Sequence, residues 1–149
     1  MIKQVLLPIL GTVAFIIAVG LFVQKSKPAT TPTSSPIVTI GEKTIKVTVA
    51  KTKEERSKGL SGTTSLEENN GMLFVFDPEA SPTFWMKDML ISIDIIWISD
   101  GKVVKIDKNV QIDSKTYNPG QPIDYVLEVN AGFSDKNNIK VGDPATITL

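Results

Sequence analysis

The chain of 149 residues contains no cysteine and no histidine. Without cysteine it can form no disulfide, use no thiol nucleophile and carry no lipid on an N-terminal cysteine. Without histidine it cannot build a Ser-His-Asp triad, and the lack of both residue types excludes almost every zinc or transition-metal site. We therefore expect no metal and no cofactor, and carboxylates, cations and aromatic rings remain as candidates for function.

An excess of charge of either sign is also missing, since the chain has 16 basic and 16 acidic residues. Residues 1–36 hold three lysines and no acid, so residues 37–149 keep 13 basic and 16 acidic residues, a net charge of minus three. Recognition of nucleic acid needs a basic face. We therefore expect no nucleic-acid partner.

One long apolar run stands near the N-terminus. Residues 5–23 form a predominantly apolar stretch of 19 residues, which is about the length that a helix needs to cross a bilayer core. A cleaved signal peptide is the alternative, but its apolar region is usually only about 7–15 residues long. We favour a transmembrane anchor, or an uncleaved signal, over residues 1–25, which makes the membrane a partner.

A linker follows this run, because residues 26–36 are rich in proline, threonine and serine and predict an extended, solvated stalk. Lys3 and the amino terminus on one side of the run nearly balance Lys25 and Lys27 on the other, so the positive-inside rule gives no orientation. A stalk behind an N-terminal anchor suggests export. We therefore expect a single-pass protein of the cell membrane with an extracytoplasmic soluble domain, residues 37–149.

The pattern of residues 37–149 predicts one domain that is mainly β, or α+β. Apolar and polar residues alternate over residues 45–49 and 123–129, as is typical of strands with one buried face. The continuous apolar run of residues 71–76 predicts a central strand covered on both faces, and the capping-box pattern of residues 52–55 predicts a short helix. Together these elements predict a small curled antiparallel sheet or barrel with one or two short helices.

Local turn signals predict a hairpin, a long loop and a second short helix. Asp100-Gly101 lies between two apolar runs and predicts a tight hairpin. Residues 107–122 show little periodicity and predict a long loop. Residues 134–138 predict a capped helical turn, before a last strand over residues 145–149.

Several sequence blocks resemble, in the same order, the family known as domain of unknown function 192. These blocks are Arg56-x-x-Gly59-Leu60, Gly71-Met72-Leu73-Phe74-x-Phe76, Phe84-Trp85-Met86-Lys87, Asp94-Ile95 and Leu127-Glu128-x-x-Ala131-Gly132. The resemblance spans Val47 to Asp143 and implies a compact, largely β domain, often carried behind a signal peptide or membrane anchor, with no established activity. The chain departs from the family at Asp88-Met89, where Asn-Thr is usual, and at Ser61, where Met is frequent. A carboxylate at Asp88 lacks the donor of an amide, so a ligand contact there would differ.

Charged residues within apolar segments are the candidates for a site. Asp94 lies among isoleucines where both strand faces are apolar, and a buried carboxylate needs a cation or several donors. Arg56 or Lys87 could supply them, either as a staple between helix and sheet that binds nothing or as part of a cleft. Trp85 shares strand parity with Lys87 and is either a stacking platform or simply core. The predicted ligand-binding residues are Arg56, Trp85, Lys87, Asp88, Asp94 and Glu128.

A polar ring stacked on Trp85, with cations and carboxylates around its hydroxyls, would suit a saccharide. We expect a binding module for a polar ligand of the cell envelope, such as a saccharide. One alternative is a hydrolase of envelope carbohydrate, in which Asp94 pairs with Asp88 or Glu128. The other is a structural or accessory protein whose polar cluster only holds the fold together.

Overall fold

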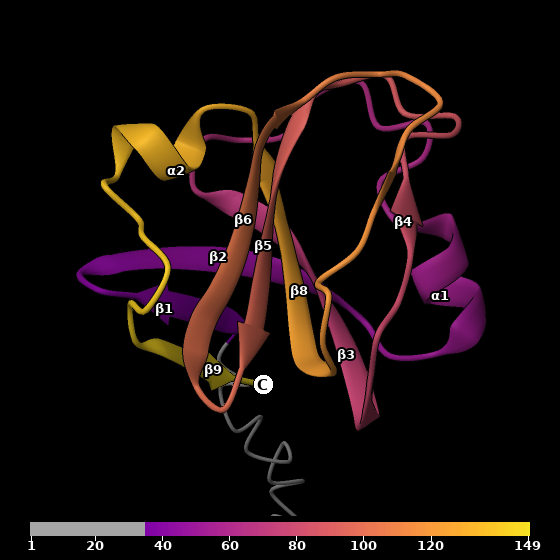
Figure 1. Cartoon of the computed structure of the whole chain (residues 1–149). Coiled ribbons are helices and arrows are strands. Elements are labelled where there is room, and N and C mark those ends of the chain that lie inside the picture. The colour runs from indigo at the N-terminus through magenta and orange to yellow at the C-terminus, as the bar shows by residue number, and fades with distance from the viewer. Residues whose placement is uncertain (1–34) are drawn as a thin grey trace, which may run out of the picture. The chain divides into compact units, whose positions relative to one another are not determined.

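The computed structural model describes residues 35–149 (Figure 1). The predicted anchor and nearly all of the predicted linker lie outside the described residues. Among the described residues, no helix has the length and apolar character needed to cross a bilayer. In chain order the elements are β1 (Ile37–Ile40), β2 (Lys43–Ala50), α1 (Lys53–Lys58), β3 (Asn70–Ala80), β4 (Phe84–Trp85), β5 (Ile93–Ser99), β6 (Lys102–Val110), β7 (Thr116–Tyr117), β8 (Ile123–Asn130), α2 (Phe133–Lys136) and β9 (Ala145–Thr148).

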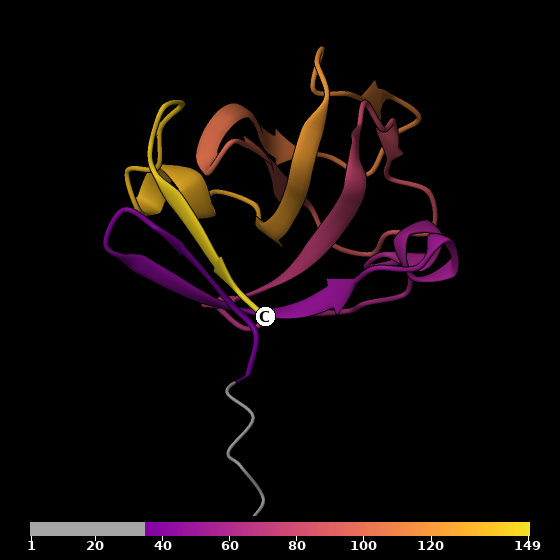
Figure 2. The same cartoon turned by 90° about the horizontal axis from the view of Figure 1, so that it is seen from below.

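Seven strands form one sheet in the order β6-β5-β8-β3-β2-β1-β9. Its neighbouring strands are antiparallel, except for β2 and β3, which run parallel and are connected by a crossover that contains α1. The sheet curls (Figure 2), and its two edge strands meet at one end, where Lys102 bridges to Pro144. This half-barrel with two short helices confirms the predicted mainly β, curled sheet.

Apolar side chains are buried on both faces of this sheet. The first core holds side chains from all seven strands, together with Phe133 of α2. The second core lies on the opposite face and combines side chains of β3, β5 and β8 with Leu60, Met86 and Met89. All seven residues of β5 are buried, and because side chains alternate along a strand, Ile96 joins the first core while Trp97 joins the second.

A separate two-stranded sheet, β4 with β7, lies over the second core. Phe84 of β4 packs edge-on against Phe74 and Trp97, with ring centroids 4.9 and 5.4 Å apart, a geometry that aromatic pairs prefer. The predicted long loop over residues 107–122 is therefore shorter than expected. Strand β6 continues to Val110, and β7 lies within the rest of the segment.

The predicted turns and helices are confirmed with one correction. Helix α1 begins with a complete capping box, in which the Thr52 hydroxyl accepts the Glu55 N–H and the Glu55 carboxylate accepts the Thr52 N–H. Asp100 and Gly101 both have positive φ, at 51° and 68°, as the tight hairpin between β5 and β6 requires. The predicted capped turn over residues 134–138 forms as α2, but its N-cap is Gly132 and no side chain within α2 caps it.

Candidate functional site

A pocket of about 210 Å³ opens between α1, β3 and β4, whose positions Figure 1 shows. Its apolar walls come from both strands and from the loops near them. Its polar lining comes mainly from α1 and from β8. The lining residues that matter for its chemistry are Lys53, Arg56, Ser57, Lys58, Phe74, Phe76, Phe84, Trp85 and Glu128.

Glu128 is the unusual group of this pocket. It lies on β8 between Met72 of β3 and Ile95 of β5, which are its cross-strand neighbours on the side of the second core. Its side chain is only 5% exposed, and its Oε2 has no hydrogen-bond partner among the described residues. Burial raises the pKa of Glu128 to about 8, because desolvation disfavours the charged form. At neutral pH the carboxyl is therefore mostly protonated and offers both a donor and an acceptor.

Arg56, the only arginine of the chain, forms part of the helical wall of the pocket. Its Nη1 donates to the carbonyl oxygens of Lys51 and Val75, the latter at 3.1 Å. Its guanidinium carbon lies 5.0 Å from the centroid of the Phe76 ring, a favourable cation–π distance. Arg56 thus ties α1 to β3 through backbone carbonyls and an aromatic ring, and no carboxylate of the described residues forms an ion pair with it.

Trp85 lines the same pocket from β4 and is 56% exposed. The alternative in which this tryptophan is core is therefore wrong. Trp97 takes the core position instead, fully buried, with its Nε1 donating to Asp107 at 2.7 Å. Part of this indole is therefore available to a ligand.

Lys87 and Asp88 do not belong to the pocket lining. The expected extended segment ends at Trp85, and the chain then turns, with the Met89 N–H donating to the Met86 carbonyl at 3.2 Å. Asp88 has a φ of 58°, and both side chains are exposed. Strand parity therefore does not apply to Lys87, which is why it lies apart from Trp85.

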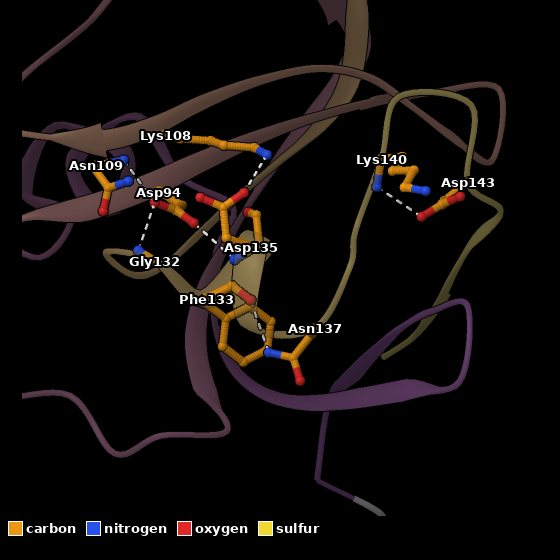
Figure 3. Close-up of polar contacts among 10 residues, drawn as sticks. Asp94, Lys108, Asn109, Gly132, Phe133, Asp135, Asn137, Lys140 and Asp143 are labelled. Atoms are coloured by element: carbon orange, nitrogen blue, oxygen red, sulfur yellow. Dashed lines mark hydrogen bonds and ion pairs between the residues drawn. The ribbon is translucent and has the colours of Figure 1, made fainter.

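Asp94 does not line this pocket and is fully buried; Figure 3 shows its polar contacts. Its carboxylate accepts the backbone N–H groups of Asn109 at 2.8 Å, Gly132 at 3.0 Å and Ser134 at 2.8 Å. These three donors meet the predicted need of a buried carboxylate for a cation or several donors. The expected pairing with Arg56 or Lys87 is wrong, and Asp94 fixes the start of α2 to the sheet.

Three of the six predicted residues therefore meet at one pocket, namely Arg56, Trp85 and Glu128. Their role in ligand binding stays a prediction. Sequence reasoning missed Lys53, Ser57 and Lys58, which also line the pocket. A usable signal was present, because residues three and four apart in a helix share a face, and Lys53 stands at these spacings from Arg56 and Ser57.

A second polar group lies outside this pocket. Glu79, Asp100 and Asp124 have carboxylate oxygens within 4.8 Å of one another, and among residues 35–149 they form the one acidic group compact enough to share a cation. Asp124, and to a smaller extent Asp100, raises the pKa of Glu79 by charge repulsion. Asp124 also accepts the Asp100 N–H at 2.9 Å, so part of the group has a role in the hairpin.

Comparison with known proteins places the chain in a family. The model for domain of unknown function 192, described as an uncharacterized ACR, matches residues 36–147. The fold is similar to a crystal structure of a protein of unknown function from Novosphingobium aromaticivorans, with 33% identity, a TM-score of 0.71, and 74% of this chain and 83% of that chain covered. It is also similar to a crystal structure of a candidate transcription regulator from Sinorhizobium meliloti, with 25% identity, a TM-score of 0.70, and 75% and 91% covered. Among curated proteins none matches. The chain belongs to the family of domain of unknown function 192.

Proposed function

We propose that the protein is a binding module that takes a small polar ligand, such as a saccharide of the cell envelope, in the pocket between α1, β3 and β4. The observation that carries this proposal is Glu128, a buried carboxyl that lines the pocket and whose Oε2 has no partner in the described part of the chain. Buried polar atoms are nearly always hydrogen-bonded, and leaving one unpaired costs about 1–3 kcal/mol. A ligand hydroxyl or amide at this position would remove that cost.

The other pocket residues suit such a ligand. Exposed Trp85 offers a flat apolar surface, on which the C–H face of a sugar ring can stack, while Arg56 and Ser57 of α1 also line the pocket and carry hydrogen-bond donors. A volume of about 210 Å³ is below the range of about 300–1,000 Å³ that drug-sized ligands occupy. The pocket therefore favours a ligand with a single ring.

The hydrolase alternative finds less support. A raised carboxyl pKa is what a general acid needs, but a glycosidase of the usual kind needs a second carboxylate across the scissile bond. Among the described residues, Glu128 is the one carboxylate in the pocket lining. Asp94 is occupied by three backbone N–H groups, and Asp88 lies outside the lining.

Binding can be tested with the full chain in a detergent that has no sugar headgroup. Titration calorimetry against methyl glucoside, methyl glucuronide and N-acetylglucosamine should detect at least one ligand. We expect Trp85→Ala and Glu128→Leu to weaken binding about 10-fold or more, with Lys87→Ala as the matched control outside the pocket. Binding by none of these probes, or binding that Trp85→Ala and Glu128→Leu leave unchanged, would contradict the proposal.

We further propose that residues 1–25 anchor the protein in the cell membrane with the described domain on the extracytoplasmic side. The 19-residue apolar run and the polar stalk behind it support this arrangement. The protein should stay with membranes during alkaline extraction. A protease added to the extracytoplasmic side of sealed vesicles should cut the stalk and release the domain, whereas release only after the vesicles are opened would refute the orientation.

A further inference from the structure

The mouth of the proposed binding pocket is basic. Lys53, Arg56 and Lys58 all belong to its lining, and Glu128, the one acid of the described lining, is buried and mostly protonated at neutral pH. All three cations come from α1, a single short helix. This local positive charge contrasts with residues 37–149 as a whole, which carry a net charge of minus three.

None of these cations is neutralised by an ion pair within residues 35–149. The ion pairs found there use Lys105, Lys108, Lys115 and Lys136. Glu55, the acid next to Arg56 in sequence, turns to the start of the helix, where its carboxylate accepts the N–H groups of Lys51 and Thr52, both at 2.8 Å. The hydrogen bonds of Arg56 to described residues all come from Nη1, which leaves Nε and Nη2 for another acceptor.

The floor of the pocket has the opposite character. Phe74 is buried beside Phe84. A charged group of a ligand placed against this apolar surface and Glu128 would lose its hydration and would have no cation as a partner there. A neutral hydroxyl, in contrast, can exchange hydrogen bonds with the protonated carboxyl. The pocket therefore has cations at its mouth, which can bind a negatively charged group, and a neutral hydrogen-bonding carboxyl at its floor.

We infer that the ligand is an acidic monosaccharide, a sugar ring whose carboxylate lies at the mouth among Lys53, Arg56 and Lys58 while a ring hydroxyl meets Glu128. This inference rests on the proposed binding function and specifies its ligand class. Cations that form no ion pair, placed around a low-dielectric opening, raise the local concentration of anions. A guanidinium with free donors can also hold a carboxylate in a bidentate manner.

The test compares methyl glucuronide with methyl glucoside, a pair that differs in the carboxylate. Titration of the full chain at low salt should show the glucuronide binding about 10-fold or more tightly than the glucoside, and added salt should reduce this advantage. The double variant Lys53→Gln/Lys58→Gln should lose most of the advantage, measured as the ratio of the two dissociation constants. The control Lys46→Gln/Lys102→Gln removes two exposed lysines outside the pocket and should keep it.

The outcomes separate the two proposals. Equal affinity for the two sugars, or preference for the glucoside, would overturn the acidic ligand and leave the binding function standing. A preference for the glucuronide that survives in Lys53→Gln/Lys58→Gln would overturn the assignment of the carboxylate to the mouth. Failure of both sugars and of N-acetylglucosamine to bind would overturn both proposals together.

Discussion

The carboxylate of Asp94 accepts the backbone N–H of Ser134 at 2.8 Å, across 40 residues of sequence. The same side chain accepts the N–H of Gly132, which is the N-cap residue of α2. The start of a helix leaves backbone donors without partners, and α2 has no capping side chain of its own. Asp94 of β5 therefore serves as a remote cap that joins this short helix to the sheet.

Substitution of Asp94 should destabilise the domain, whereas substitution of Lys87 should not. In Asp94→Asn one oxygen can still accept, but the amide nitrogen would face a backbone donor, and we expect a loss of about 1–3 kcal/mol in the free energy of unfolding. Asp94→Ala leaves three buried N–H groups unpaired and should cost more. Lys87→Ala, on an exposed turn, should stay within about 0.5 kcal/mol. Urea unfolding followed by circular dichroism measures all three, and equal stability of Asp94→Asn and Lys87→Ala would contradict the capping role.

Glu128 should make stability depend on pH. Burial raises its pKa from 4.5 to about 8 in the folded protein, so the folded state binds more protons than the unfolded state between these values. The stability that neutral Glu128 provides is complete below pH 4.5 and is lost as the pH rises through about 8. Compared with Glu128→Gln, whose amide does not titrate, the native protein should lose up to about 1.4 kcal/mol per pH unit in this window.

Unfolding measurements of both proteins at pH 5, 7 and 9 test this dependence. We expect Glu128→Gln to gain stability relative to the native protein at each step. A difference between the two that does not change with pH would show that Glu128 is ionised and solvated in the folded protein, which would also remove the neutral donor from the pocket floor.

Gly71 should not tolerate a side chain. A Cβ at this position would lie 2.6 Å from the backbone oxygen of Glu128, on the neighbouring strand β8, and backbone cannot move aside cheaply. We expect Gly71→Ala to cost about 1–3 kcal/mol, as overpacked cores do, while the volume-conserving control Met72→Leu should cost less than about 1.5 kcal/mol. Thermal unfolding compares the two. Because the clash displaces β8 at Glu128, Gly71→Ala should also weaken ligand binding, and a fully stable variant would refute the close approach.

Much of the fold could be predicted because its signals are local. The capping box of α1, the Asp100-Gly101 hairpin and the apolar run of β3 each depend on residues that are neighbours in sequence. The parallel pairing of β2 with β3 could not be predicted, since it depends on how the crossover packs. Trp85 and Trp97 both lie in apolar surroundings, and the sequence does not tell which one is covered.

The site could be predicted only in part for the same reason. Arg56, Trp85 and Glu128 come from three separate elements, and their convergence is decided by the strand order of the sheet. The sequence indicates that a buried carboxylate needs hydrogen-bond partners, but it does not indicate which groups these are. The Asp94 carboxylate accepts three backbone N–H groups, whereas the Oε2 of Glu128 has no hydrogen-bond partner within residues 35–149. This difference separates a structural acid from a candidate ligand contact.

The meeting of the two edges of the half-barrel bears on how the protein behaves at high concentration. Beside the Lys102–Pro144 bridge, the Val103 N–H donates to the Asp143 carbonyl and the Ala145 N–H to the Gly101 carbonyl. At this end, the backbone groups that could pair with a strand of another molecule are thus already hydrogen-bonded. Further along, β6 carries the charged residues Lys105, Asp107 and Lys108, and charges on an edge strand oppose pairing with another molecule. At high concentration the domain would in this way resist joining its neighbours into extended fibrils.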